Sequence, residues 1–562
     1  MARDPGEGGA FVFDLVDDEA ADPEAPRARS RPAGADDPDD DDPGDDDPGT
    51  DEPPPSGGPS RNVRAVAPVA AVLAIVLGTG LAAEGAQDNA RIERMRDVHG
   101  GVADVSSPLR ETWKWEGLVG SRRAIEEGRG NEVAVLGDVL VFESDGELVA
   151  LRPATGEEVW TVPLGEAPDC GPLGAAGWEE TTTPALVCLA GSGANREVTV
   201  VGPDGVASAP RLLGAADTKR YGEPRPGPDG TVLRAKREAS GPAVSSGDAV
   251  CTDTGECTGT VEAGRDLVLR AEDAVTGEER WSVTVPFRAT RADQCNNWLG
   301  TSWDGSGNMV DLEQMLDPGA FGARIQGTLV QLYGCGIEAA VTPDGVPLGM
   351  TIEPGTGGVN SLVAGGYTGF TFDDTVRTVL YAADGEVVGE ITGHALEPGV
   401  TDGSGPGTLL ATDSSGRRLR AYESDGTPRW VITTRADAQL FLALVGGTAM
   451  VMTEVGTVRG LDAATGAERW VWDGSDDVGG GYLEDLFVSR AFTDGQSALL
   501  LTEDGAGGAG LVALDVASGE VVWEQHGDEA VTGGTAQGFD TALVAVDGNL
   551  LEVTPSGVRG LG

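Results

Sequence analysis

Four segments of the chain repeat one pattern: a short apolar run, a Thr-Gly or Ser-Gly pair, and a closing tryptophan. The pairs and their tryptophans are Thr155-Gly156 with Trp160, Thr276-Gly277 with Trp281, Thr465-Gly466 with Trp470, and Ser518-Gly519 with Trp523. Glycine tolerates the positive φ of a tight turn, so each copy predicts a strand, a turn and a second strand. The tryptophan offers a large apolar plate that can pack between neighbouring sheets. Such repetition constrains the fold more than composition does.

Weaker copies of the pattern fill the gaps between the strong ones. Three keep the turn and lose the tryptophan, one keeps its Trp430, and a last hairpin precedes the C-terminus: Asp204-Gly205, Asp344-Gly345, Asp384-Gly385, Asp425-Gly426 and Ser556-Gly557. The chain therefore carries nine hairpins. Between Gly345 and Gly466 the turns recur at about the 40-residue period of a four-stranded propeller blade.

Further β runs stand upstream of the turns, for example at Val139–Phe142, Ala449–Met452 and Ala498–Thr502. These runs are apolar on both faces and must be covered above and below, as strands are in stacked propeller blades. We therefore expect an all-β domain, a β-propeller, over residues 105–562. A solenoid of β-repeats is the alternative. Five tryptophans are expected to pack the blades: Trp160, Trp281, Trp430, Trp470 and Trp523.

The motif, approximately LVALDxxTGExxW, resembles the pyrroloquinoline-quinone-type (PQQ-like) repeat. Quinoprotein dehydrogenases share this repeat with the propeller of the bacterial outer-membrane protein assembly factor. The resemblance covers nearly all of the chain after Val105 and implies about eight four-stranded blades, although nine hairpins are present. Trp113-Lys114-Trp115 has no strand partner nearby in the sequence. We expect it to complete the last blade beside Leu550 to Val558 and so to close the ring.

Residues 1–60 form an acidic segment, in which Asp, Pro and Gly dominate the run from Asp36 to Glu52. Like charges repel, and no apolar periodicity offsets the cost of ordering, so this tail is predicted to be disordered and cytoplasmic. The apolar patch Phe11–Asp18 is either a docking motif or an incidental feature. The net charge of -53 argues against nucleic acid as a partner, because phosphate binding requires clustered Lys and Arg.

One uncharged stretch, Ala65–Ala83, is long enough to cross a bilayer as a helix, and residues 61–84 are predicted to be a signal anchor. Arg61 and Arg64 precede the stretch, which places the N-terminus in the cytoplasm and the propeller outside, on the cell membrane. A cleaved signal peptide is the rival interpretation. Residues 85–104 are expected to form a juxtamembrane stalk that is partly helical.

All six cysteines lie after this apolar stretch, as disulfides on the oxidising side of a membrane would require. Pairing of sequence neighbours gives Cys170 with Cys188, Cys251 with Cys257, and Cys295 with Cys335, although six cysteines allow 15 connectivities. Buried free thiols are the alternative. Longer gaps between turns coincide with the cysteines, so we expect disulfides to staple loop insertions.

The sequence favours a binding module over an enzyme, and we predict no catalytic, cofactor-binding or metal-binding residue. A quinoprotein resemblance implies an Asp base, a calcium site and often two adjacent cysteines, and the chain has no adjacent cysteine pair. No CxxC is present, and the three histidines are scattered. The first hypothesis is therefore a membrane-anchored scaffold for a protein, peptide or envelope ligand, held at the rim or funnel of the propeller. The alternative is a PQQ-dependent dehydrogenase with a diverged active site.

Overall fold

The protein divides into two compact units, Met1–Val76 and Leu77–Gly562, and all described residues lie in the second. The computed structural model describes residues 90–120, 132–166, 168–176, 181–193, 196–241, 244–251, 257–295, 301–303, 309–311, 316–362, 365–371, 376–404, 408–413, 416–433, 438–454, 456–474, 487–503, 509–526 and 542–562. The acidic tail, its patch Phe11–Asp18 and the span at 61–84 therefore lie outside the described residues. Within the described ranges, no helix combines the length and the apolar character that crossing a membrane requires.

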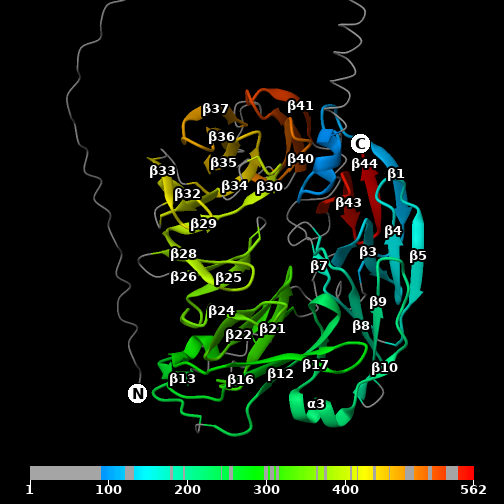
Figure 1. Ribbon diagram of the computed structural model, residues 1–562, viewed down its shortest axis with the longest axis vertical. Helices are drawn as coiled ribbons and strands as arrows, with labels where there is room; N and C mark the ends of the chain where they lie inside the picture. The colour runs from blue at the N-terminus through cyan, green and yellow to red at the C-terminus, as the bar shows by residue number, and fades with distance from the viewer. Residues whose placement is uncertain are drawn as a thin grey trace, which may run out of the picture. The chain divides into compact units, whose positions relative to one another are not determined.

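The described residues form nine sheets of four or five strands, which surround a central axis (Figure 1) and are numbered as blades 1 to 9 in chain order. Blade 1 contains β2 (Glu132–Leu136), β3 (Val139–Ser144), β4 (Glu147–Leu151), β5 (Glu158–Pro163) and β7 (Gly174–Ala175). Blade 2 contains β6 (Asp169–Gly171), β8 (Leu186–Ala190), β9 (Glu197–Val201) and β10 (Arg211–Leu212). Blade 3 contains β11 (Pro224–Pro226), β12 (Thr231–Arg237), β16 (Leu267–Asp273) and β17 (Glu279–Val285).

The next three blades follow the same antiparallel plan. Blade 4 contains β21 (Phe321–Gln326), β22 (Leu329–Gly334), β23 (Ile337–Val341) and β24 (Pro347–Leu348). Blade 5 contains β25 (Gly357–Ser361), β26 (Tyr367–Thr371), β27 (Arg377–Tyr381) and β28 (Val387–Thr392). Blade 6 contains β29 (His394–Leu396), β31 (Leu409–Thr412), β32 (Arg418–Tyr422) and β33 (Pro428–Thr433).

The last three blades complete the ring. Blade 7 contains β34 (Leu440–Val445), β35 (Thr448–Glu454), β36 (Thr457–Asp462), β37 (Glu468–Asp473) and β30 (Pro398–Thr401), which pairs in parallel with β34. Blade 8 contains β38 (Phe487–Thr493), β39 (Ser497–Glu503), β40 (Ala509–Asp515) and β41 (Val521–His526). Blade 9 contains β42 (Ala542–Val546), β43 (Asn549–Thr554), β44 (Gly557–Leu561) and β1 (Glu111–Glu116).

An apolar core lies between each pair of consecutive blades. The cores contain aliphatic side chains from the inner strands, as expected for strands that are apolar on both faces. One of them joins Phe142 and Val149 of blade 1 to Val544 and Leu551 of blade 9. The first and last blades are therefore in contact, and the ring is closed.

The N-terminal strand closes this ring as predicted. β1 runs antiparallel to β44, with Trp113 opposite Gly560 and Trp115 opposite Val558. The blade count inferred from the resemblance was wrong: the described residues form nine blades, not about eight. Each of the nine hairpins lies in a different blade, so none is superfluous. Eight of the turns join the third strand of a blade to the fourth, whereas the turn before Gly557 joins the second to the third, because β1 is the fourth strand there.

The closing tryptophans dock on the turns of the next blade. The indole N–H donates to a backbone carbonyl of that turn in five pairs: Trp113 to Pro153 (2.9 Å), Trp160 to Pro203 (3.0 Å), Trp281 to Pro343 (2.6 Å), Trp430 to Ala463 (2.9 Å) and Trp470 to Val516 (2.9 Å). The turn glycine lies against the ring. A Cβ added at Gly519, where φ is +73°, would lie 2.5 Å from Trp470. Each of these tryptophans therefore contacts the turn of the next blade.

Two blades replace part of this contact with other groups. Blade 2 lacks the tryptophan, and the Arg211 Nε donates instead to Ala274 O at 2.8 Å in the turn of blade 3. Blade 9 lacks the turn because its fourth strand is β1, which does not follow β44 in the chain, and Trp523 donates instead to Val105 O at 2.8 Å. At these two positions a hydrogen bond to a backbone carbonyl is kept, although the donor or the acceptor segment differs.

The antiparallel order of the strands gives the ring two different faces. The turns between the first and second strands and between the third and fourth strands lie at one end of every blade, and we call this end the turn face. The turns between the second and third strands, together with the connections from blade to blade, lie at the other end. The connection from β10 to β11 contains α3 (Ala215–Tyr221) and belongs to this second face.

The chain enters the propeller on the turn face. A helix at 90–96 precedes an extended segment that crosses blades 8 and 9. Met95 is 1% exposed, the Val102 N–H donates to Thr493 O (2.8 Å), and the Ala103 N–H donates to Gly548 O (2.7 Å). Residues 90–104, expected to form a stalk, thus pack against the first turns of blades 8 and 9.

Candidate functional site

Two long insertions interrupt the face opposite the turn face, both beside blades 3 and 4. Residues 238–266 separate β12 from β16 and contain β13 (Val250–Cys251), β14 (Cys257–Thr258) and β15 (Thr260–Val261). Residues 286–320 separate β17 from β21 and contain β18 (Thr290–Arg291), η3 (Ala292–Cys295), β19 (Thr301–Trp303) and β20 (Met309–Asp311). We call 238–266 and 286–320 the stapled insertions, and the face that carries them the insertion face.

The stapled insertions hold each other in place. β15 pairs with β18, with Thr260 opposite Arg291 and Val261 opposite Thr290. A small core beneath them contains fully buried Val261, Cys295 and Cys335, with Phe287 packed against it. The two loops therefore form one substructure with its own core, although β16 and β17 separate them in the sequence.

All three predicted disulfides are present. Cys251–Cys257 lies inside the first insertion, and Cys295–Cys335 joins the second insertion to the turn between β22 and β23 of blade 4. These two bonds confirm that disulfides staple the insertions, and free thiols are ruled out because no cysteine is unpaired. Cys170–Cys188 differs, because it links adjacent strands β6 and β8 within blade 2.

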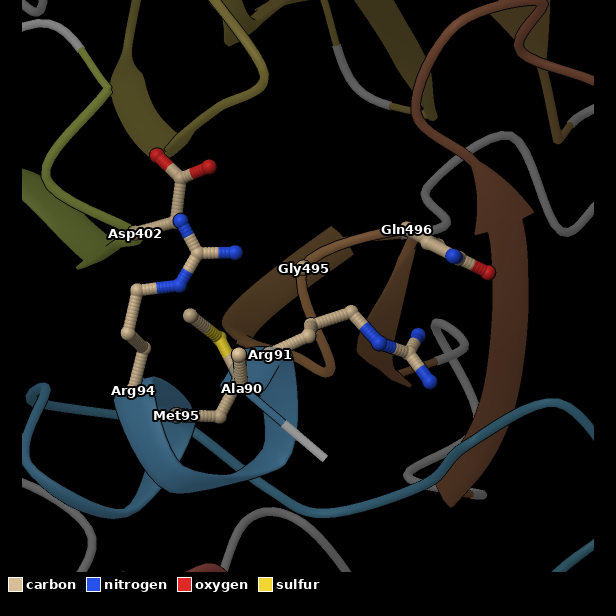
Figure 2. A pocket seen from close by; sticks show the side chains of 7 residues that line it. All are labelled: Ala90, Arg91, Arg94, Met95, Asp402, Gly495 and Gln496. Carbon is tan, nitrogen blue, oxygen red and sulfur yellow. The ribbon is translucent and has the colours of Figure 1, made fainter. Parts of the chain in front are cut away.

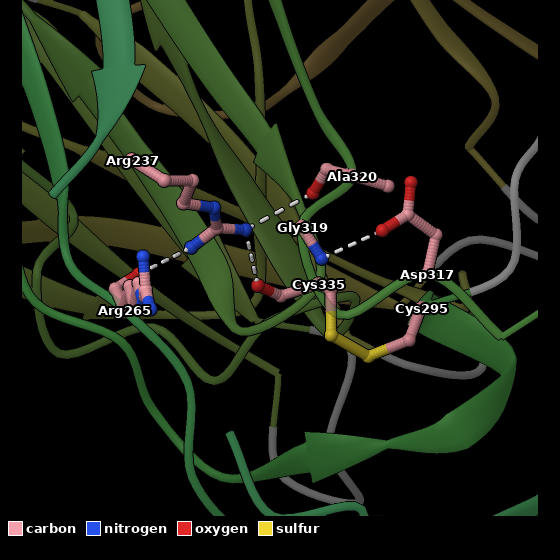
Figure 3. The surroundings of a disulfide bond; sticks show 7 residues. All are labelled: Arg237, Arg265, Cys295, Asp317, Gly319, Ala320 and Cys335. Carbon is pink, nitrogen blue, oxygen red and sulfur yellow. Dashed lines mark hydrogen bonds between the residues drawn. A yellow bond between two sulfur atoms is a disulfide. The ribbon is translucent and has the colours of Figure 1, made fainter. Parts of the chain in front are cut away.

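Arg237 ties both insertions to the propeller (Figure 3). Its guanidinium donates to Arg265 O (2.8 Å) in the first insertion, to Ala320 O (3.0 Å) in the second, and to Cys335 O (2.7 Å) in blade 4. Burial lowers the pKa of Arg237 to about 10, although nearby Asp317 and Asp266 oppose this shift. The residue stays charged at neutral pH, and three carbonyl acceptors offset its loss of hydration.

The sequence did not single out Arg237. It lies at the end of the run Thr231–Arg237, where it resembles an ordinary strand-end arginine. Its partners are as many as 98 residues away, so no local pattern reveals them. The sequence offers one signal for its role: Arg237 stands immediately before residues 238–266, a long insertion that contains two cysteines.

The stapled insertions expose apolar side chains to solvent. Val250 is 64% exposed and Val244 is 48% exposed, and both belong to the first insertion. Exposed loops held on a rigid framework are common locations of binding sites in proteins. The arrangement can contact a partner.

A second candidate is a cavity of about 660 Å³ on the turn face. The helix at 90–96 forms one wall through Arg91 and Arg94, and Asp402 and Gln496 line the opposite wall (Figure 2). Arg91 lies 3.7 Å from Asp494, a residue that is 2% exposed. Arg94 is exposed and makes no ion pair with any described residue.

The described residues offer no donor set for the calcium that a quinoprotein resemblance implies. In the described ranges, no group of three or more His, Cys, Asp or Glu side chains is placed so that it could hold a metal ion. Four of the predicted packing tryptophans donate to a turn of the next blade, and Trp523 donates to Val105 of the N-terminal segment: Trp160, Trp281, Trp430 and Trp470 form the first group. We therefore derive no chemical step through a quinone or a metal.

The fold and its repeats define the class of the protein as a β-propeller with PQQ-like repeats. Residues 373–557 match the model of the family described as outer membrane protein assembly factor BamB. This match confirms the resemblance that the hairpin motif indicated. No curated protein compared with the chain matches it significantly.

Several solved structures resemble the chain. BamB from Moraxella catarrhalis is 12% identical, with a TM-score of 0.35, and the match covers 81% of this chain and 99% of that one. The C-terminal WD40 domain of Sif2 is 9% identical, with a TM-score of 0.37, over 82% of this chain and 99% of that one. Quinohemoprotein alcohol dehydrogenase from Comamonas testosteroni is 11% identical, with a TM-score of 0.33, over 84% of this chain and 78% of that one.

Proposed function

We propose that this protein is a membrane-anchored, extracytoplasmic scaffold that binds a protein, peptide or envelope ligand through its insertion face and does not act as an enzyme. In this proposal residues 61–84 anchor the chain, the acidic tail stays in the cytoplasm, and the propeller lies outside.

One observation carries the proposal: the chain enters on one face and the stapled insertions occupy the other. The N-terminal segment binds the first turns of blades 8 and 9, so a tether there leaves the insertion face unobstructed. A scaffold held at a membrane needs this separation between its anchored side and its binding side.

The disulfides support the extracytoplasmic location. All six cysteines are paired, and such bonds persist in oxidising compartments while they are rare in the cytosol. Two of the three bonds hold the insertions, where they restrict loop motion and so reduce the entropy lost when a partner binds.

The match to the BamB-type family model supports a protein partner, because that family is described as an assembly factor. A PQQ-dependent dehydrogenase is the alternative that the repeat alone permits. No specific arrangement of described residues favours it, so it enters the test only as the competing outcome.

The experiment uses intact cells that produce the full-length chain. A membrane-impermeant photoactivatable crosslinker is applied, and the molecules joined to the chain are identified. Full-length protein in mild detergent is assayed in parallel for dye-linked oxidation of alcohols and sugars, with PQQ and calcium added. We expect one reproducible crosslinked partner and no quinone-dependent oxidation. Oxidation that requires both PQQ and calcium would contradict the proposal.

A further inference from the structure

Two charged side chains line the cavity on the turn face and form no ion pair with each other. Arg94 has no ion-pair partner among the described residues, and the same is true of Asp402. Figure 2 shows Arg94 directed toward the side of the cavity where Asp402 lies, whereas Arg91 points toward the loop of Gly495 and Gln496. A ligand that carries a cation and an anion would match both groups.

The second arginine does not add a further free cation to the cavity. Arg91 lies 3.7 Å from Asp494, whose carboxylate also accepts the N–H groups of Gln496 (2.9 Å) and Ser497 (2.7 Å). Arg91 and Asp494 therefore fix the helix to blade 8. The charge available to a ligand on this wall is that of Arg94.

Asp402 is held in position but keeps its negative charge for a ligand. Its Oδ1 accepts the Ser404 N–H (2.8 Å) and its Oδ2 accepts the Gly446 N–H (3.0 Å). Each carboxylate oxygen can accept more than one hydrogen bond, so a primary ammonium can still bind. The carboxylate is thus oriented before a ligand arrives.

The position of the cavity indicates where such a ligand comes from. The predicted span ends at Ala83, and Ala90 already lines the cavity. Seven residue steps reach at most about 25 Å when fully extended. If residues 61–84 are embedded in the membrane, Ala90 at the cavity therefore lies no more than about 25 Å from the end of the span.

We propose that this cavity binds the head group of a phosphatidylethanolamine-type lipid, with the phosphate at Arg94 and the primary ammonium at Asp402. The inference rests on the membrane anchor of the proposed function. It adds that the turn face lies on the bilayer and has a preference among lipids. Choline head groups lack N–H donors for Asp402, and glycerol head groups lack the cation, so ethanolamine is preferred over both.

Native mass spectrometry of the full-length chain in mild detergent tests the proposal. Phosphatidylethanolamine, phosphatidylcholine and phosphatidylglycerol are added in equal amounts, and the bound lipids are counted. We expect about a tenfold preference for phosphatidylethanolamine, as the loss of a charge-assisted hydrogen bond from the other lipids implies. Arg94→Gln should weaken binding of all three lipids, and Asp402→Asn should remove only the preference.

Arg110→Gln is the matched control, because Arg110 is an exposed arginine beside the chain terminus on the same face. It should leave the preference unchanged. A preference that survives both Arg94→Gln and Asp402→Asn in folded protein would overturn the inference. Equal occupancy by soluble glycerophosphoethanolamine would overturn the assignment to a lipid.

Different results would contradict the proposed function and the lipid site. If alkaline carbonate extracts the full-length chain from membranes, the anchor is wrong and both ideas fall. If the chain resists extraction and still crosslinks its partner, while the variants bind lipids as wild type does, only the lipid site is wrong.

Discussion

The indole N–H of Trp113 donates to the carbonyl oxygen of Pro153 across 2.9 Å, and this bond joins the last blade of the ring to the first. Trp113 belongs to the N-terminal strand β1, and Pro153 precedes the turn of blade 1. The same contact recurs between other blades, so closure of the ring repeats the packing found inside it. The stability of the ring should therefore depend on the indole N–H groups and on the glycines beneath them.

Two tryptophans in one strand allow the hydrogen bond to be tested. Trp470 and Trp472 are buried to a similar degree, with 8% and 7% of their surface exposed. The indole N–H of Trp470 donates to Val516 O. The indole N–H of Trp472 has no hydrogen-bond partner among the described residues. We expect Trp470→Phe to cost about 1–2 kcal/mol more than Trp472→Phe, because only the first leaves an acceptor unpaired. Urea unfolding of both variants measures the difference. Equal losses would contradict the docking role of the indole N–H.

A glycine pair tests the contact beneath the ring. Gly519 has φ +73° and would place a Cβ 2.5 Å from Trp470, whereas Gly146 has φ +86° and nothing within 4 Å of that position. Gly519→Ala should lower the unfolding midpoint substantially more than Gly146→Ala. Both variants carry backbone strain of about 1 kcal/mol, but only Gly519→Ala adds a steric overlap with Trp470. Thermal melts of the two variants measure this difference. Similar melting temperatures would contradict close packing of Gly519 against Trp470.

One buried carboxyl predicts an unusual pH dependence. Glu552 is 0% exposed, and burial raises its pKa to about 7 even though Arg559 lies 2.6 Å away and opposes the shift. Because the folded pKa exceeds the ordinary value of 4.5, the folded state holds this proton more tightly. The resulting stability is fully present below about pH 4.5 and is lost as the pH rises through 7.

Glu552→Gln removes this titration. From pH 5 to pH 8, wild type should lose up to about 3 kcal/mol relative to the variant, since each pKa unit corresponds to about 1.4 kcal/mol. The two proteins should be alike near pH 5, where Glu552 is protonated. Chemical unfolding at several pH values gives the comparison. Parallel pH profiles for the two proteins would show that Glu552 does not titrate in this range.

Arg237 should control the order of the stapled insertions. Its guanidinium donates to three carbonyls, so Arg237→Met leaves those acceptors without their shared donor. We expect amide hydrogen exchange in 257–266 and 316–321 to become about one to two orders of magnitude faster, with blades 7 and 8 unaffected. Arg291→Gln is the control, because Arg291 is 70% exposed and, among the described residues, its guanidinium pairs only with neighbouring Asp293. Unchanged amide exchange in Arg237→Met would show that Arg237 does not order the stapled insertions.

The sequence predicted much of the fold because its signals are local. A turn glycine and a tryptophan four residues later mark one hairpin, and each disulfide joins cysteines that are neighbours in the sequence, at separations of 18, 6 and 40 residues. The pairing of β1 with β44 was also predicted, because Trp113 to Trp115 had no nearby partner. The number of blades was wrong because it came from a family resemblance, whereas the hairpins themselves indicated nine.

The sequence could not locate the contacts between distant segments. Arg211 takes the place of a tryptophan through an acceptor 63 residues away, and the charges of the turn-face cavity come from a helix at 90–96 and from Asp402. Stacking of blades 2 and 3 brings the first pair together, and packing of the N-terminal helix on the turn face brings the second set together. The span at 61–84 and the acidic tail lie outside the described residues and remain predictions.

The most direct test of the binding face compares valines of matched exposure on the two faces of the propeller. Val250 and Val244 lie on the insertion face and are 64% and 48% exposed, while Val206 and Val275 lie in turns of the turn face and are 66% and 50% exposed. Each is replaced in the full-length chain by a photoreactive amino acid, and intact cells are irradiated. We expect a crosslinked partner from positions 250 and 244 and none from positions 206 and 275. A partner captured only from positions 206 and 275 would contradict it.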